Sequence, residues 1–93
     1  MTTTYRNPWH NGRNNDYGPA FYSTEAKPTE YRGFLIYHAN PKGWDIVKDG
    51  VCISQRAGFD GAKRFIDKIY DDPSDCFVER ALSYLSLREA AAA

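Results

Sequence analysis

The segment from Tyr31 to Tyr70 constrains the fold more than any other part of the chain. It reads YRGFLIYHANPKGWDIVKDGVCISQRAGFDGAKRFIDKIY. Three short apolar runs are separated by Asn40-Pro41-Lys42-Gly43 and Asp49-Gly50, two sequences that favour tight turns. A run with apolar residues at three- and four-residue spacing comes next, which is typical of an amphipathic helix. This order predicts a three-stranded antiparallel meander followed by a helix.

The expected strands cover about residues 31–39, 44–48 and 51–55, and the expected helices about residues 60–71 and 74–90. Gly33 is expected to mark a bulge or a close backbone approach near the start of the first strand. Asp60 is expected to cap the first helix, and either Asp72 or Ser74 to start the second. The apolar stripe of the second helix should contain Phe77, Val78, Ala81, Leu82 and Leu85. We therefore predict one α+β domain over residues 31–93, in which the meander packs on two C-terminal helices.

Alternation along the strands sorts their side chains onto two faces of the sheet. One set is wholly apolar and should receive the helices: Phe34, Ile36, Trp44, Ile46, Val51 and Ile53. The opposite set is mixed: Leu35, Tyr37, Asp45, Val47, Cys52 and Ser54. A fully solvated face would be more polar than this second set, so either the N-terminal segment or a partner should cover it.

Residues 1–30 show no helical or strand period and are rich in Asn, Gly and Pro, so we expect an irregular arm. The arm also holds several aromatic residues, which are scarce in disordered tails. We predict that it docks on the second face of the sheet through Tyr17, Phe21 and Tyr22. A free tail is the alternative.

The whole-chain numbers exclude some classes of protein. The formal net charge is zero, which gives no bulk attraction to nucleic acid or to an anionic membrane. No apolar run approaches the ~20 residues of a membrane span, and the first fifteen residues lack the apolar region of a secretory signal. Cys52 and Cys76 are therefore expected to be reduced thiols of a cytoplasmic protein.

Signals for catalysis and for metal binding are weak. Neither His10 nor His38 is spaced to pair with a nucleophile and an orienting carboxylate. Cys52 is expected to be a buried, inert thiol, because nothing in the sequence indicates a lowered pKa. The two histidines and two cysteines lack the close pairs of a zinc site. No phosphate-binding glycine loop occurs. We expect no enzyme activity, no cofactor and no metal.

An acidic run is the sharpest candidate for a binding site. Its five carboxylates fall within thirteen residues that contain a single lysine, and they are Asp67, Asp71, Asp72, Asp75 and Glu79. Asp72 and Asp75 suit the N-terminal end of the second helix, whereas Asp67 and Asp71 lie near the C-terminal end of the first, where negative charge is disfavoured. The hypothesis is that this acidic ridge contacts a basic groove of a partner protein. An ordinary solvated surface is the alternative.

A second hypothesis makes the sheet a nucleic-acid-binding surface, because β-sheets can enter a DNA groove. The residues for phosphate contact and stacking would be Arg32, Tyr37, Lys42, Lys48 and Arg56, with Trp44 as a further stacking surface. The competing explanation is a charged sheet edge that prevents aggregation. On a neutral protein, nucleic acid is the second choice of partner.

Four short motifs carry a resemblance to a known class of proteins. They are Tyr31-Arg32-Gly33-Phe34, Gly43-Trp44-Asp45-Ile46, Gly50-Val51-Cys52-Ile53 and Ala62-Lys63-Arg64-Phe65-Ile66-Asp67. Over about residues 31–70 the chain resembles small phage and prophage accessory proteins, among them anti-CRISPR and other host-takeover inhibitors. The resemblance implies a small inhibitor that acts in the host cytoplasm by contact with a host or defence-system protein, such as a CRISPR effector complex. It transfers no catalytic residue.

Overall fold

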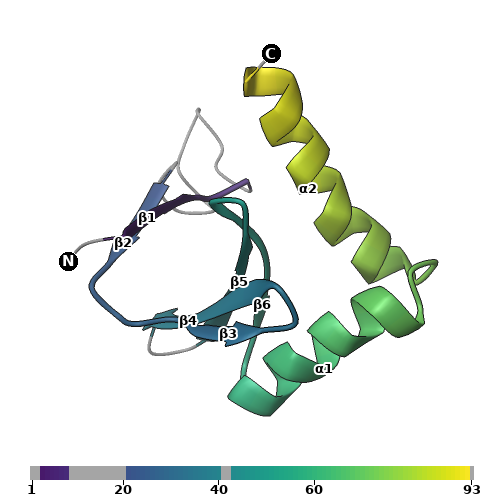
Figure 1. Ribbon diagram of the computed structural model, residues 1–93, viewed down its shortest axis with the longest axis horizontal. Helices are drawn as coiled ribbons and strands as arrows, with labels where there is room; N and C mark the ends of the chain where they lie inside the picture. Colours follow the sequence, from purple (N-terminus) through teal and green to yellow (C-terminus); the bar gives the residue numbers. More distant parts are fainter. Residues whose placement is uncertain (1–2, 9–20, 41–42, 93) are drawn as a thin grey trace.

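The protein is an α+β structure in which two helices pack on a six-stranded mixed sheet (Figure 1). The computed structural model describes residues 3–8, 21–40 and 43–92. The strands are β1 (Thr3–Arg6), β2 (Phe21–Thr24), β3 (Thr29–Tyr31), β4 (Phe34–Asn40), β5 (Gly43–Lys48) and β6 (Val51–Arg56). The helices are α1 (Phe59–Asp71) and α2 (Cys76–Ala92). The strand order is β2-β1-β6-β5-β4-β3.

The predicted antiparallel meander is present as β4-β5-β6 and forms part of a larger sheet. The prediction of an irregular arm over residues 1–30 was wrong, because β1, β2 and β3 extend the sheet at both edges. β1 pairs with β6 in parallel, and the Arg6 amide donates to the Gly50 carbonyl at 2.7 Å. These strands have only three or four residues each, too few to show a recognisable alternation.

Two tight hairpin turns connect β5 to β6 and β3 to β4. Asp49 and Gly50 form the predicted turn between β5 and β6, and both have positive φ, 53° and 78°, as a type I′ turn requires. Arg32 and Gly33 also have positive φ, 50° and 89°, and form the turn between β3 and β4. The predicted bulge at Gly33 is therefore a hairpin turn, and the first meander strand begins at Phe34.

The main core lies between the helices and one face of the sheet. All six residues predicted for this face belong to it, with Trp44 partly buried. α1 buries Ala62, Phe65, Ile66 and Ile69, and α2 buries Val78 and Ala81. Phe77 was predicted in the α2 stripe, but its side chain is 61% exposed. Neither helix is both long and apolar enough to cross a membrane.

The helix starts differ from the predicted ones. α1 begins after Gly58 without a side-chain cap, so Asp60 lies in the first turn instead of capping it. Asp75, and not Asp72 or Ser74, caps α2: its Oδ1 accepts from the amides of Phe77 at 2.9 Å and Val78 at 3.2 Å.

The sheet is strongly curled on the face away from the helices. Tyr5 of β1 stacks on Tyr37 of β4 with ring centroids 5.1 Å apart, although β6 and β5 lie between these strands in the sheet. In a flat sheet three strand steps would separate them by about 14 Å. This curl closes a second buried cluster of Tyr5, Tyr37, Val47 and Cys52, with Tyr22 and Leu35 packed against it.

The N-terminal segment thus covers the second face, although with partly different residues from those predicted. Tyr22 packs on this cluster, but Phe21 is 58% exposed. Tyr17 lies outside the described residues. Tyr5, for which the sequence suggested no role, contributes the most deeply buried ring of the segment.

Candidate binding site between strand β6 and helix α2

Asp67 of the predicted acidic ridge is engaged within the protein. Its Oδ1 accepts from Arg32 Nη1 at 2.8 Å and from the Tyr31 hydroxyl at 2.7 Å. These two bonds, the arginine contribution first, lower the pKa of Asp67. The contacts compensate a carboxylate near the C-terminal end of α1 and tie the β3–β4 hairpin to that helix.

Asp75 is engaged as well, because it caps α2 and forms an ion pair with Lys68 at 3.1 Å. The bond from Lys68 is the main cause of its lowered pKa, and the two amide bonds of the cap add to it. Asp71, Asp72 and Glu79 are exposed. Within the described part of the chain, none of these three forms an ion pair.

The residues of the nucleic-acid hypothesis are not gathered on one surface. Arg32 is bound to Asp67 and lies over the Tyr70 ring at 4.2 Å. Lys48 donates to the Gly33 carbonyl at 3.0 Å. Tyr37 is only 3% exposed, so the expectation that it offers a stacking surface was wrong. Lys42 lies outside the described residues. Arg56 pairs with Trp44, at the end of the β5–β6 hairpin away from Lys48.

The buried polar groups on the curled face are satisfied by one another. The Tyr5 hydroxyl donates to Asp45 Oδ2 at 2.5 Å, and Gln55 Nε2 donates to Asp45 Oδ1 at 2.8 Å. Burial, followed by the bond to Asp45, raises the pKa of Tyr5, and burial raises the pKa of the Cys52 thiol. Cys52 is therefore a protonated, unreactive thiol at neutral pH, as predicted. This cluster holds β1 to the sheet and presents no open group for a ligand.

A bulge in β6 creates a different surface on the helix side. Val47 pairs with Cys52 and Ile46 with Ser54, so Ile53 is an extra residue in β6. Beyond it the alternation is shifted by one residue. Ser54 and Arg56 therefore point toward the helices, and Gln55 points toward Asp45 on the opposite face. The prediction of Ser54 on the second face was wrong for this reason.

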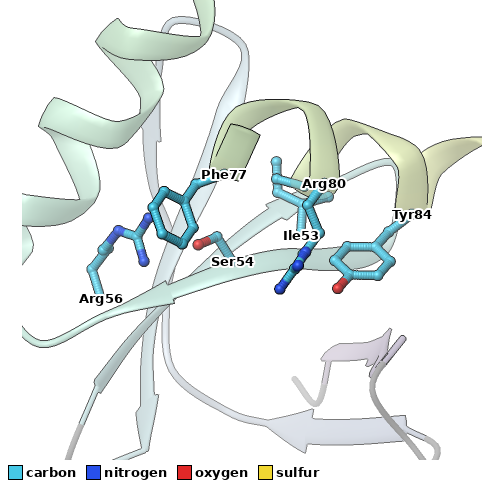
Figure 2. Close-up of a pocket in the computed structure, with 7 residues that line it drawn as sticks. Ile53, Ser54, Arg56, Phe77, Arg80 and Tyr84 are labelled. Carbon is cyan, nitrogen blue, oxygen red and sulfur yellow. The ribbon is translucent and has the colours of Figure 1, made fainter. Parts of the chain in front are cut away.

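The bulge and α2 together enclose a small pocket of about 80 Å³ (Figure 2). Figure 2 shows Ile53, Ser54 and Arg56 on β6 and, facing them from α2, Phe77, Arg80 and Tyr84. The three α2 residues have i, i+3, i+7 spacing, which places them on one face of a helix. In this view Ser54 lies between the two arginine side chains.

Both arginines bring positive charge to the pocket, and the nearby carboxylate of Asp75 acts electrostatically on Arg56. Neither Arg56 nor Arg80 forms an ion pair with any residue that the structure describes. The Arg56 guanidinium is held 4.3 Å from the Phe65 ring centroid, and Nη1 donates to the Gln55 carbonyl at 3.1 Å. Burial lowers the pKa of Arg56, yet a guanidinium stays charged at neutral pH.

A second, more open hollow adjoins the first on the other side of Arg56. Arg56, Gly61, Arg64, Phe65 and Lys68 line it. Lys68 is paired with Asp75, whereas the exposed Arg64 has no ion-pair partner among the described residues. We call the pocket with its residues Ser54, Arg56, Phe77, Arg80 and Tyr84 the arginine pocket.

Of the arginine pocket, the sequence pointed only to Arg56, and for a different surface. Phe77 was read as a core residue, and Arg80 and Tyr84 were given no function. A signal for the α2 side does exist: the i, i+3, i+7 set of Phe77, Arg80 and Tyr84 is an amphipathic stripe beside the core stripe. No local signal reveals the bulge that brings Ser54 and Arg56 to meet it.

The described residues contain no group of three or more His, Cys, Asp and Glu side chains placed to hold a metal ion. His38 stacks on Trp44 with centroids 4.0 Å apart and planes 10° apart. No family model, curated protein or solved structure matches the chain. The resemblance to phage accessory proteins therefore stays a prediction.

Proposed function

We propose that this protein is a small binding module that acts by contact with a protein partner and without catalysis. The observation that carries the proposal is an exposed aromatic ring beside two arginines that form no ion pair with a described residue: Phe77 is 61% exposed and lines the same pocket as Arg56 and Arg80. Aromatic residues and arginine are enriched at the energetic centres of protein interfaces.

The charge pattern favours a protein over nucleic acid as the partner. The chain has no net charge, and the carboxylate of Asp75 acts electrostatically on Arg56. A polyanion is bound mainly by several cations that replace its counterions. An interface of mixed charge and exposed apolar surface matches a protein surface better.

An inhibitor of a host or defence-system protein, working in the cytoplasm of a host cell, is the form of this function that we favour. The support for it is the resemblance of residues 31–70 to phage accessory proteins, and a CRISPR effector complex is one target of that class. The carboxylates Asp71, Asp72 and Glu79 are exposed and would contribute complementary charge toward basic residues of the partner.

The test compares Phe77→Ala with the matched control Phe21→Ala, since Phe21 is a ring of similar exposure on β2. Each protein is used to capture partners from a nuclease-treated bacterial lysate, and each captured protein is then purified and titrated directly. We expect one partner to bind the wild type and Phe21→Ala equally. Phe77→Ala should bind it at least ~10-fold more weakly, as expected for an interface centre.

Two results would contradict the proposed function. One is a captured partner that binds all three proteins with equal affinity. The other is a partner that the wild type captures from an untreated lysate but not from the nuclease-treated one, which would make nucleic acid the ligand.

A further inference from the structure

We propose that the arginine pocket binds the carboxylate of a single Asp or Glu side chain within a partly apolar segment of the partner. This inference rests on the proposed function, because it names the chemistry of the partner at that site. It concerns a site for which the sequence suggested no function, and it inverts the earlier hypothesis, in which acidic residues of this protein meet a basic partner.

The charges around the pocket call for an anion. Arg56 comes from β6 and Arg80 from α2, so an anion between them would connect the sheet and the helix. A guanidinium presents a planar fork of N–H donors that matches both oxygens of a carboxylate. The Ser54 hydroxyl on β6 lines the same pocket and adds a third donor. Ser54 is buried, with 8% of its surface exposed, so a bond to it would be shielded from water.

The size of the pocket restricts the anion. Its volume is about 80 Å³, and it is partly open to solvent. Sites that hold a whole small molecule have roughly 300–1,000 Å³, so this pocket suits a small group such as a carboxylate. The rest of the ligand must therefore lie outside the pocket, on the surface formed by the α2 side chains.

That surface is aromatic, which determines the neighbours of the carboxylate. Phe77 and Tyr84 flank Arg80 on one face of α2 (Figure 2). Apolar residues next to the acidic side chain would pack on these rings, and each buried methylene would contribute about 0.8 kcal/mol.

A phosphate backbone fits this surface less well than one carboxylate. Asp75 acts electrostatically on Arg56 and already engages Lys68. Successive phosphates that continue past Arg56 would approach this carboxylate, which a single bound negative charge avoids.

The experiment is an NMR titration of the ¹⁵N-labelled full chain with three capped peptides, SGLELSG, SGLQLSG and SGLKLSG. They differ only in the central residue. We expect SGLELSG to shift the amides of Ser54, Phe77 and Arg80 and the side-chain Nε of Arg56 in a saturable way. SGLQLSG should bind about tenfold more weakly, because it lacks the charge. SGLKLSG should not bind at this site.

Two variants complete the design. Arg80→Gln should weaken SGLELSG binding by about tenfold, whereas Arg6→Gln, an exposed arginine on β1, should leave it unchanged. Raising the salt concentration should weaken SGLELSG binding to the wild type more than to Arg80→Gln. An amide spectrum that retains its dispersion will show that each variant is folded.

Several outcomes would overturn the inference. They are the absence of shifts at these residues up to the solubility limit of SGLELSG, equal binding of SGLELSG and SGLQLSG, or tighter binding of a thymidine oligonucleotide to the same residues. The result is separate from that of the partner capture. If a partner binds in a Phe77-dependent way but no peptide carboxylate binds, the proposed function stands and this inference is rejected. If the carboxylate binds but no Phe77-dependent partner is found, the pocket chemistry stands and the proposed function is rejected.

Discussion

At the scale of single residues, Asp67 shows how a side chain that looks like a surface contact can be structural. Its position near the C-terminal end of α1 is unfavourable for negative charge, which made it a candidate for partner binding. Arg32 and Tyr31 supply the compensation from the β3–β4 hairpin. Tyr70 completes the same corner, since its hydroxyl donates to the Arg32 carbonyl at 2.7 Å.

This arrangement predicts a specific pH dependence. The pKa of Asp67 is lower in the folded protein than in the unfolded chain, so protons bind more tightly to the unfolded chain. The stabilisation is therefore complete above the ordinary carboxyl pKa of about 4 and is lost as the pH falls through the lowered pKa. Asp67→Asn should be less stable than the wild type at pH 7 and should lose less stability below pH 4.

The measurement is urea denaturation over a pH series, with Asp71→Asn as the control because Asp71 is exposed and forms no ion pair among the described residues. If Asp67→Asn and the wild type have parallel pH profiles, the contacts of Asp67 do not contribute to stability.

At the scale of elements, the start of α2 and the bulge in β6 decide where the arginine pocket lies. The bulge turns Ser54 and Arg56 toward the helices. Asp75 fixes the first turn of α2 through the amides of Phe77 and Val78, and thereby the position from which Phe77 and Arg80 extend. The bulge and the cap each depend on residues that are close in sequence, but the pocket requires both features.

Removal of the cap should therefore have a measurable cost. Asp75→Ala loses two bonds to free amides and the ion pair with Lys68. We expect a loss of about 1 kcal/mol in the free energy of unfolding, the usual value for a helix N-cap. Asp72→Ala is the control, because Asp72 is exposed in the same connection. Equal denaturation midpoints for the two variants would mean that the cap is not important for α2.

At the scale of the whole molecule, the sheet is buried on both faces by different means. The helices cover one face, and the curl of the sheet closes the other around Tyr5, Tyr37 and Cys52. β1 pairs with β6 at Arg6 and Val51, and the Tyr5 ring and its bond to Asp45 also attach the N-terminal segment to the sheet.

The thiol of Cys52 reports on this attachment. In a Cys76→Ser background, Cys52 is the single thiol, and it is completely buried. We expect it to react slowly with an aromatic disulfide reagent in the native protein. Tyr5→Ala should raise that rate by about tenfold or more, because truncating a large core ring costs on the order of 3–5 kcal/mol.

Tyr70→Ala is the matched control for this rate, since the Tyr70 side chain is 50% exposed and lies on the helix side. If Tyr5→Ala leaves the labelling rate of Cys52 unchanged, the second face is not closed by the N-terminal segment.

Local patterns in the sequence determined the elements of the central unit. The Asp49-Gly50 turn, the spacing of Ala62, Phe65 and Ile69, and the alternation in β4 and β5 each depend on residues a few positions apart. Such patterns report period and turn chemistry directly, and they correctly predicted the α+β class, the antiparallel meander and the helix-facing side of the sheet.

The tertiary structure alone decided the candidate site and the closure of the second face. Short strands such as β1 become strands only when the sheet offers hydrogen-bond partners. A bulge shifts every later side chain to the other face, although the residues themselves follow no unusual pattern. Arg56 and Arg80 are brought to one pocket by two elements that are separated by all of α1, and neither forms an ion pair with a described residue. The meeting of distant groups depends on packing, and packing is not encoded in any single stretch of the chain.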